Sequence, residues 1–156
     1  MDSTDFGIRG CTGIGDYVYR YKWFWKTLPW RDKNSNMDLL IALFTGLIAA
    51  LHGYFLWFEM FAWTTRGKKI FRKFPEELFE PTKALAANQG LYNGFLAAGL
   101  LWTFFIDDNA WKTYVGIFFA GCVAVAGMYG ALTADRKIFF VQALPALILL
   151  ALLHLR

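Results

Sequence analysis

The sequence has few of the residues that build metal centres and redox sites. It contains only two cysteines and two histidines. Cys11 lies in a polar N-terminal stretch and Cys122 lies deep in an apolar run, with no C-x-x-C spacing around either. Zinc sites and disulfide frameworks depend on paired cysteine and histidine spacings, so we expect two free thiols, no metal site and no cofactor.

Catalytic signatures are also missing. The chain has no H-x-x-x-H pair, no G-x-S-x-G and no glycine-rich phosphate-binding loop. Each of these motifs places a metal ligand, a nucleophile or backbone amides at a fixed spacing. We therefore do not expect an enzyme, although a non-catalytic subunit of an enzyme complex is compatible with the sequence.

The first 36 residues lack the early apolar segment of a secretory signal. Asp2, Asp5 and Asp16 are atypical of mitochondrial presequences, which are poor in acidic residues. We expect any targeting information to be internal.

Apolar and aromatic residues are abundant instead. Hydrophobic residues make up 57% of the chain and aromatic residues 19%, and the mean hydropathy is +0.36. These values are atypical of water-soluble proteins. The net charge of +4 comes mainly from basic residues that flank apolar runs. This pattern favours a membrane partner over nucleic acid.

Four apolar runs are long enough, or nearly so, to cross a bilayer core, which takes roughly 17–25 helical residues. We expect helices at about 39–63, 84–106, 114–134 and 138–155, with a kink at Pro145. Short links force antiparallel neighbours. The prediction is an all-α membrane protein, a four-transmembrane-helix up-down-up-down bundle over 38–156 that follows an N-terminal extension over 1–37. Lys and Arg are equally numerous on the two predicted sides, so the positive-inside rule does not choose an orientation.

Several hydrogen-bonding side chains interrupt these runs. When depth is counted at about 1.5 Å per residue, most of them fall in one layer near the end of the first run. We expect an intramembrane polar cluster of His52, Glu59, Asn88, Gln89, Asn93, Tyr129 and Gln142. The cluster either locks the helix register, at about 1 kcal/mol or less for each hydrogen bond, or binds a ligand or proton at Glu59.

Small residues form stripes on the second and third runs. Helical spacing aligns Ala86 with Gly90 and Gly94, and Gly116 with Ala120 and Gly127. Small side chains let membrane helices approach closely, so we expect these two helices to form the tight pair.

A basic loop over 64–83 joins the first two runs. It is either a short amphipathic helix on the headgroups or an irregular loop anchored by aromatic residues. Its charges predict a lipid-headgroup contact, with a phospholipid such as cardiolipin as the one candidate ligand. The residues of this contact are Arg66, Lys68, Lys69, Arg72 and Lys73.

The N-terminal extension alternates aromatic with basic residues in the stretch DYVYRYKWFWKTLPWR. A period of two is a strand-like signal, and aromatic residues are enriched in protein interfaces and at membrane surfaces. The segment either anchors at the membrane or docks onto a partner, and we favour the partner. The docking residues are Tyr17, Tyr19, Tyr21, Trp23, Trp25 and Trp30.

Four stretches resemble the domain of unknown function 1304 family of small four-helix membrane proteins. They are FEMFAWTTRGKKIF, KALAANQGLYNGFLAAGLLW, GCVAVAGMYGALT and VQALPALILLAL, and the resemblance covers about residues 38–155. It implies the four-helix fold and supplies no activity. The family's usual Trp-Thr-Thr-Pro-Arg-Gly appears here without the proline, from Trp63 to Gly67.

Two functions are consistent with these features. The first is a non-catalytic accessory subunit of a multi-subunit membrane complex, foremost a respiratory-chain complex or ATP synthase of the mitochondrial inner membrane. The alternative is a small transporter or membrane enzyme that uses His52, Glu59, Gln89 and Asn93.

Overall fold

The computed structural model describes residues 35–72 and 74–156, which we treat as one unit. All regular structure in these residues is helical, which confirms the all-α prediction for this part of the chain. The predicted docking residues Tyr17, Tyr19, Tyr21, Trp23, Trp25 and Trp30 lie outside the described residues, as do the strand-like alternation, Cys11 and Lys73.

Four long helices carry the architecture. They are α2 (Ser35–Phe61), α4 (Lys83–Trp102), α5 (Asn109–Thr133) and α6 (Leu144–Leu155). Between α2 and α4 the chain forms a π-helical turn (Trp63–Gly67), the short α3 (Lys68–Ile70) and a 3-10 turn (Glu76–Leu78). A further 3-10 turn (Thr103–Phe105) follows α4, and a π-helical turn (Phe139–Ala143) leads into α6.

Local chemistry explains two of the helix boundaries. The Asp108 carboxylate accepts a 2.8 Å hydrogen bond from the Trp111 backbone N–H, which caps the start of α5. Pro145 lacks an N–H, and its ring crowds the carbonyl four residues earlier. A π-helical turn lies just before Pro145, at the position of the predicted kink, and its wider turn relieves that crowding.

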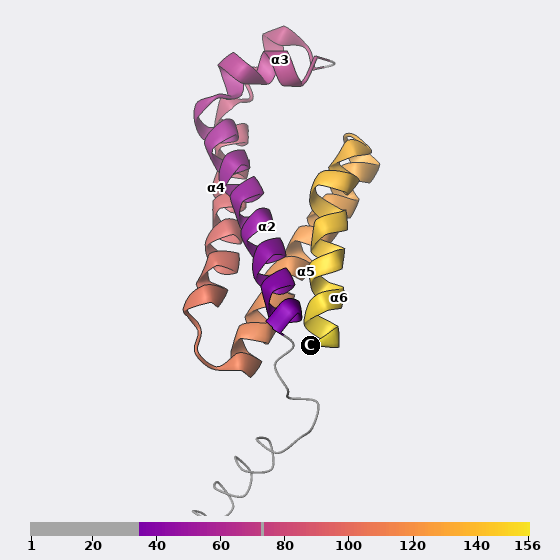
Figure 1. Cartoon of the computed structure of the whole chain (residues 1–156). Helices are drawn as coiled ribbons and strands as arrows, with labels where there is room; N and C mark the ends of the chain where they lie inside the picture. The colour runs from indigo at the N-terminus through magenta and orange to yellow at the C-terminus, as the bar shows by residue number, and fades with distance from the viewer. Residues whose placement is uncertain (1–34, 73) are drawn as a thin grey trace, which may run out of the picture. The chain divides into compact units, whose positions relative to one another are not determined.

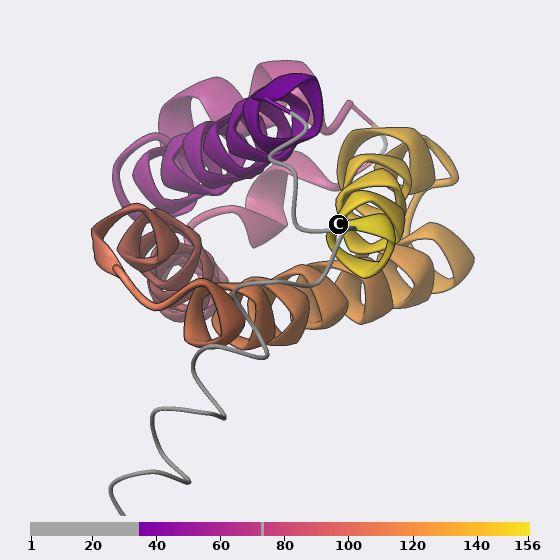
Figure 2. The ribbon, with the colours of Figure 1, turned by 60° about the horizontal axis from the view of Figure 1, so that its bottom comes forward.

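The four long helices form two antiparallel pairs. α4 packs most extensively on α2, and α5 packs on the segment from Phe139 to Leu155 that contains α6 (Figures 1 and 2). A Cβ on Gly90 would lie 3.1 Å from the backbone oxygen of Leu56. A Cβ on Gly127 would lie 2.5 Å from the backbone nitrogen of Ala143. The prediction that α4 and α5 form the tight pair is therefore wrong.

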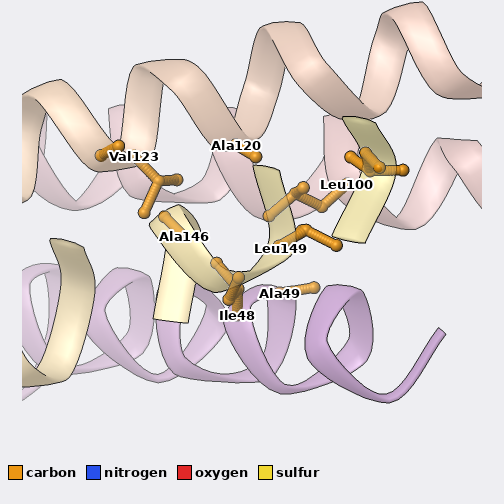
Figure 3. Packing of buried hydrophobic residues seen from close by; sticks show 9 residues of the cluster. Ile48, Ala49, Leu100, Ala120, Val123, Ala146 and Leu149 are labelled. Carbon is orange, nitrogen blue, oxygen red and sulfur yellow. The ribbon is translucent and has the colours of Figure 1, made fainter. Parts of the chain in front are cut away.

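The core lies where the two pairs meet. Small and aliphatic side chains from all four helices interlock there, as Figure 3 shows for part of the set. The buried members are Ile48 and Ala49 of α2, Leu100 of α4, Ala120, Val123 and Ala124 of α5, and Ala146, Leu149 and Leu153 of α6. Contacts from every long helix make the two pairs one packed unit.

Two of the described helices are long and apolar enough to cross a membrane, α2 and α5. Only 22% and 33% of their apolar windows are buried inside the bundle, so most of their apolar surface faces outward. The segment from Phe139 to Leu155 is apolar but shorter. α4 is 20 residues long, and Asn88, Gln89 and Asn93 lower its hydropathy.

Candidate functional site

Glu59 and Asn93 meet between α2 and α4. The Asn93 side-chain amide donates a 2.7 Å hydrogen bond to Glu59 Oε2 and a longer one, 3.3 Å, to the Gln89 carbonyl. Asn93 is buried and Glu59 is half-buried. Gly90 lies beside this bond, since a Cβ there would come within 3.0 Å of Glu59 Cβ. The close approach of the helix backbones thus brings the two polar groups into bonding distance.

His52 lies about two turns deeper in α2 and is almost fully buried, with 1% of its surface exposed. Its Nδ1 is 2.8 Å from the Ile48 carbonyl oxygen, so we assign the proton of the neutral ring to Nδ1. Its Nε2 is buried with no hydrogen-bond partner. The structure gives His52 no hydrogen bond to Glu59, and the two groups belong to different layers of the bundle.

The side chains of the remaining members of the predicted cluster make no hydrogen bond to the bonded pair of Glu59 and Asn93. Asn88 and Gln89 are exposed on α4, and Tyr129 is 68% exposed on α5. Gln142 is half-buried, and its Cβ lies 2.9 Å from where a Cβ on Gly127 would be. Of the seven predicted side chains, only Asn93 and Glu59 are joined by a hydrogen bond, so the prediction that all seven form one cluster is wrong. Counting residues gives the depth of a side chain but not the side of the helix from which it projects.

The segment that joins α2 to α4 lies at one end of this helix pair (Figure 1). Aromatic rings of this segment pack together with a ring of α2, and we call the group the aromatic cap. Its members are Phe58, Trp63, Phe71, Phe74 and Phe79, and neighbouring ring centroids lie 5.0–6.2 Å apart. Phe79 is 1% exposed, and a Cβ on Gly67 would lie 2.8 Å from its ring. Trp63 Nε1 donates a 3.0 Å hydrogen bond to Thr82 Oγ1.

The structure corrects the first interpretation of the 64–83 loop. The loop contains short helical turns rather than one amphipathic helix, and several of its aromatic rings pack on one another. Part of the apolar spacing therefore reflects internal packing. Three large apolar side chains of the loop remain exposed: Ile70 at 53%, Phe71 at 44% and Leu78 at 40%.

The basic residues of the loop differ in their surroundings. Lys68 Nζ bonds to Glu76 Oε1 at 2.8 Å, and this hydrogen bond lowers the pKa of the Glu76 carboxyl. The Arg66 guanidinium lies over the Trp57 ring, 5.1 Å from its centroid. Lys69 and Arg72 are exposed. The predicted lipid contact therefore divides into an ion-paired lysine, a stacked arginine and two exposed cations.

An ion pair that the sequence did not suggest joins the first and last helices of the described bundle, at the end opposite the aromatic cap. Arg156 Nε lies 2.8 Å from Asp38 Oδ1, and Arg156 Nη2 is 3.4 Å from the Asn109 side-chain oxygen. The contact links the start of α2, the start of α5 and the end of α6. Residues so far apart in the sequence carry no local signal of such a contact. Among the described residues, no group of three or more His, Cys, Asp or Glu side chains is placed to hold a metal ion.

Comparisons with known proteins cover most of the described bundle. The chain is similar to an uncharacterized protein, YpaA, of Lactococcus lactis subsp. lactis (strain IL1403), with 31% identity over 108 residues, 68% of this chain and 89% of the relative. No solved structure matches. The model of the protein family of unknown function DUF1304 matches residues 46–154. The chain is therefore a member of the DUF1304 family.

Proposed function

We propose that the chain is an integral membrane protein in which all four long helices cross the bilayer. α4 runs antiparallel to α2 and is about 30 Å long, close to the thickness of a bilayer core. α5 runs beside the segment from Ile138 to Leu155, which contains α6: Gly116 lies beside Leu153 and Gly130 beside Ile138. A helix that packs along a spanning helix lies at the same depth, which supports four spans.

The outward surface fits this placement. Exposed large apolar side chains occur on every long helix, including Phe61 at 72%, Leu85 at 71%, Leu132 at 87% and Leu155 at 72%. Soluble monomers rarely expose large contiguous apolar patches. A lipid environment explains the exposed apolar side chains on all four helices.

Within that membrane, we propose a non-catalytic accessory subunit of a multi-subunit complex. The hydrogen bond between Asn93 and Glu59 carries this proposal, because it uses the intramembrane carboxylate to hold two helices together. The family match begins at residue 46, so the aromatic stretch over 17–30 lies outside the matched residues. That segment supplies the docking contacts in this proposal.

We propose a respiratory-chain complex or ATP synthase of the mitochondrial inner membrane as the first assembly to search. A bacterial relative shares the bundle region, so the bundle itself does not select an organelle. The organelle therefore rests on the N-terminal segment alone.

Native gels of mildly solubilised source membranes test the accessory role. The full chain is expected to comigrate with a larger assembly, and a variant lacking residues 1–36 is expected to run free of it. Tyr129→Ala is the control variant, because Tyr129 is exposed on α5, and it is expected to comigrate with the larger assembly. Migration of the full chain at the mass of the detergent-bound monomer would remove the proposal.

A second candidate function, a small transporter or membrane enzyme, is favoured by the unpartnered His52 Nε2. A buried acceptor without a partner is costly and is often retained for function. Glu59→Gln keeps an acceptor for Asn93, so the variant is expected to fold. If reconstituted vesicles show a proton-coupled flux that this substitution abolishes, the second candidate replaces the first.

A further inference from the structure

The outward surface at the capped end of α2 combines apolar rings with a fixed cation. Tyr54, Trp57 and Phe61 are 45%, 40% and 72% exposed, and one helical turn separates each from the next. They form a strip on the outer side of the proposed span. Arg66 lies at the end of this strip, with its guanidinium 5.1 Å from the centre of the Trp57 ring.

The position of Arg66 is set by the backbone around it. The Arg66 backbone N–H donates a 2.8 Å hydrogen bond to the Ala62 carbonyl within the π-helical turn. The same turn carries Trp63, which is packed into the aromatic cap and bonded to Thr82. A packed turn therefore holds the Arg66 backbone in place, so that ligand binding has little of the backbone left to order.

The capped end of the described bundle carries more positive charge than the opposite end. Between Arg66 and Lys83, basic residues outnumber the acidic residues Glu76, Glu77 and Glu80. At the opposite end, Arg156 is paired with Asp38, and Asp107 and Asp108 lie near Lys112. Lys68 is already paired with Glu76, whereas Lys69 is three residues after Arg66 and exposed.

We propose that this surface binds an anionic phospholipid, whose phosphate pairs with Arg66 and Lys69 and whose acyl chains lie along Tyr54, Trp57 and Phe61. The proposal deepens the proposed function, since it assumes that α2 spans the membrane. Guanidinium groups suit phosphate because their planar donors match its oxygens. Trp57 is suited to the interface, where one edge of an indole meets headgroups and its body meets acyl chains.

The test measures lipid retention by the full-length chain, purified in a neutral detergent, by native mass spectrometry. Phosphatidylglycerol is expected to be retained about tenfold better than phosphatidylcholine, because the choline cation of phosphatidylcholine offsets the charge of its phosphate and repels Arg66 and Lys69. Arg66→Gln is expected to abolish this preference, and Arg66→Lys is expected to keep only part of it because lysine lacks the planar fork.

One control and one further test variant make the result specific to this site. Lys137→Gln removes a positive charge from the turn between α5 and α6 and is expected to keep the preference for phosphatidylglycerol. Trp57→Leu removes the ring under Arg66 and is expected to weaken the preference, which decides the question if Arg66→Gln does not fold. Equal retention of the two lipids by the unmodified chain, or an equal loss in Lys137→Gln and Arg66→Gln, would overturn the proposal.

A competition arm separates lipid from free phosphate. Inorganic phosphate in excess is expected to leave phosphatidylglycerol bound, because the acyl chains contribute contacts that phosphate lacks. Complete displacement by phosphate would assign the site to a soluble anion and overturn the proposal. Failure of the accessory role would appear in the native gels, whereas this assay needs no partner, so the two failures are distinguishable.

Discussion

At the scale of single residues, the amide of Asn93 and the carboxylate of Glu59 carry the clearest energetic prediction. Asn93→Ala removes the donor and leaves Glu59 half-buried without this partner. We expect the free energy of unfolding to fall by about 1–2 kcal/mol, more than one interhelical hydrogen bond contributes, because the half-buried Glu59 carboxylate also loses its partner. Asn88→Ala, on the exposed side of α4, is the matched control and is expected to change little. Detergent denaturation followed by circular dichroism measures both, and equal effects would contradict the assignment.

For His52 we expect the opposite result, because removing its polar atoms should not lower the stability of the protein. Its Nε2 is buried without a partner, which costs roughly 1–3 kcal/mol for such a polar group. Leucine has a similar size and no polar atoms, so His52→Leu is expected to leave the melting temperature unchanged or raise it. His52→Ala, which opens a cavity, is expected to lower it. A large decrease in the leucine variant would mean that Nε2 has a partner in the folded protein.

The sequence predicted part of this residue-scale detail. Depth counting brought Glu59 and Asn93 together as candidates, because both fall near the same end of the predicted spans. It failed for Tyr129 and Gln89, because the rotation of a helix about its axis is set by its neighbours. The contact between Arg66 and Trp57 crosses a π-helical turn, where the usual spacing of three or four residues no longer applies.

At the scale of elements, two glycines of α5 form a matched pair. A Cβ on Gly127 would lie 2.5 Å from the Ala143 backbone nitrogen, whereas a Cβ on Gly121 would meet no atom within 4 Å. We expect Gly127→Ala to lower the free energy of unfolding by about 1–3 kcal/mol, because the backbones must separate. Gly121→Ala is expected to be neutral or slightly stabilising, because alanine favours helix. Thermal unfolding in detergent measures both, and a neutral Gly127→Ala would contradict the close contact.

The extents of the elements were easier to predict than their partners. Apolar runs and turn residues are local signals, and the four long helices lie within or close to the predicted ranges. The small-residue stripes correctly indicated close backbone approach at Gly90 and Gly127. They did not indicate which helix approaches, because a stripe of small residues can pack against any helix of complementary shape. Gly99 of α4 lies close to Phe119 of α5, so α4 also approaches α5.

At the scale of the whole molecule, four spans predict a fixed pattern of accessibility. The background for this test replaces Cys11 and Cys122 with serine. In that background, Glu77→Cys and Asp135→Cys are expected to react with a membrane-impermeant thiol reagent from the same side. Asp107→Cys is expected to react only from the other side, because α4 and α5 each cross the membrane in the proposed arrangement. Labelling of sealed and opened vesicles measures this pattern. Reaction of Asp107 and Glu77 variants from one side would mean that α4 does not cross.

The sequence by itself determined that the described chain is helical and that its neighbouring helices run antiparallel. Long apolar runs must satisfy their backbone groups internally, and short links leave only one direction of return. Tertiary structure alone decided that α2 pairs with α4 and that α5 pairs with α6. It also decided that the loop aromatics close into a cap and that Asp38 meets Arg156. These contacts join residues far apart in the chain, and their energy depends on how whole surfaces fit together.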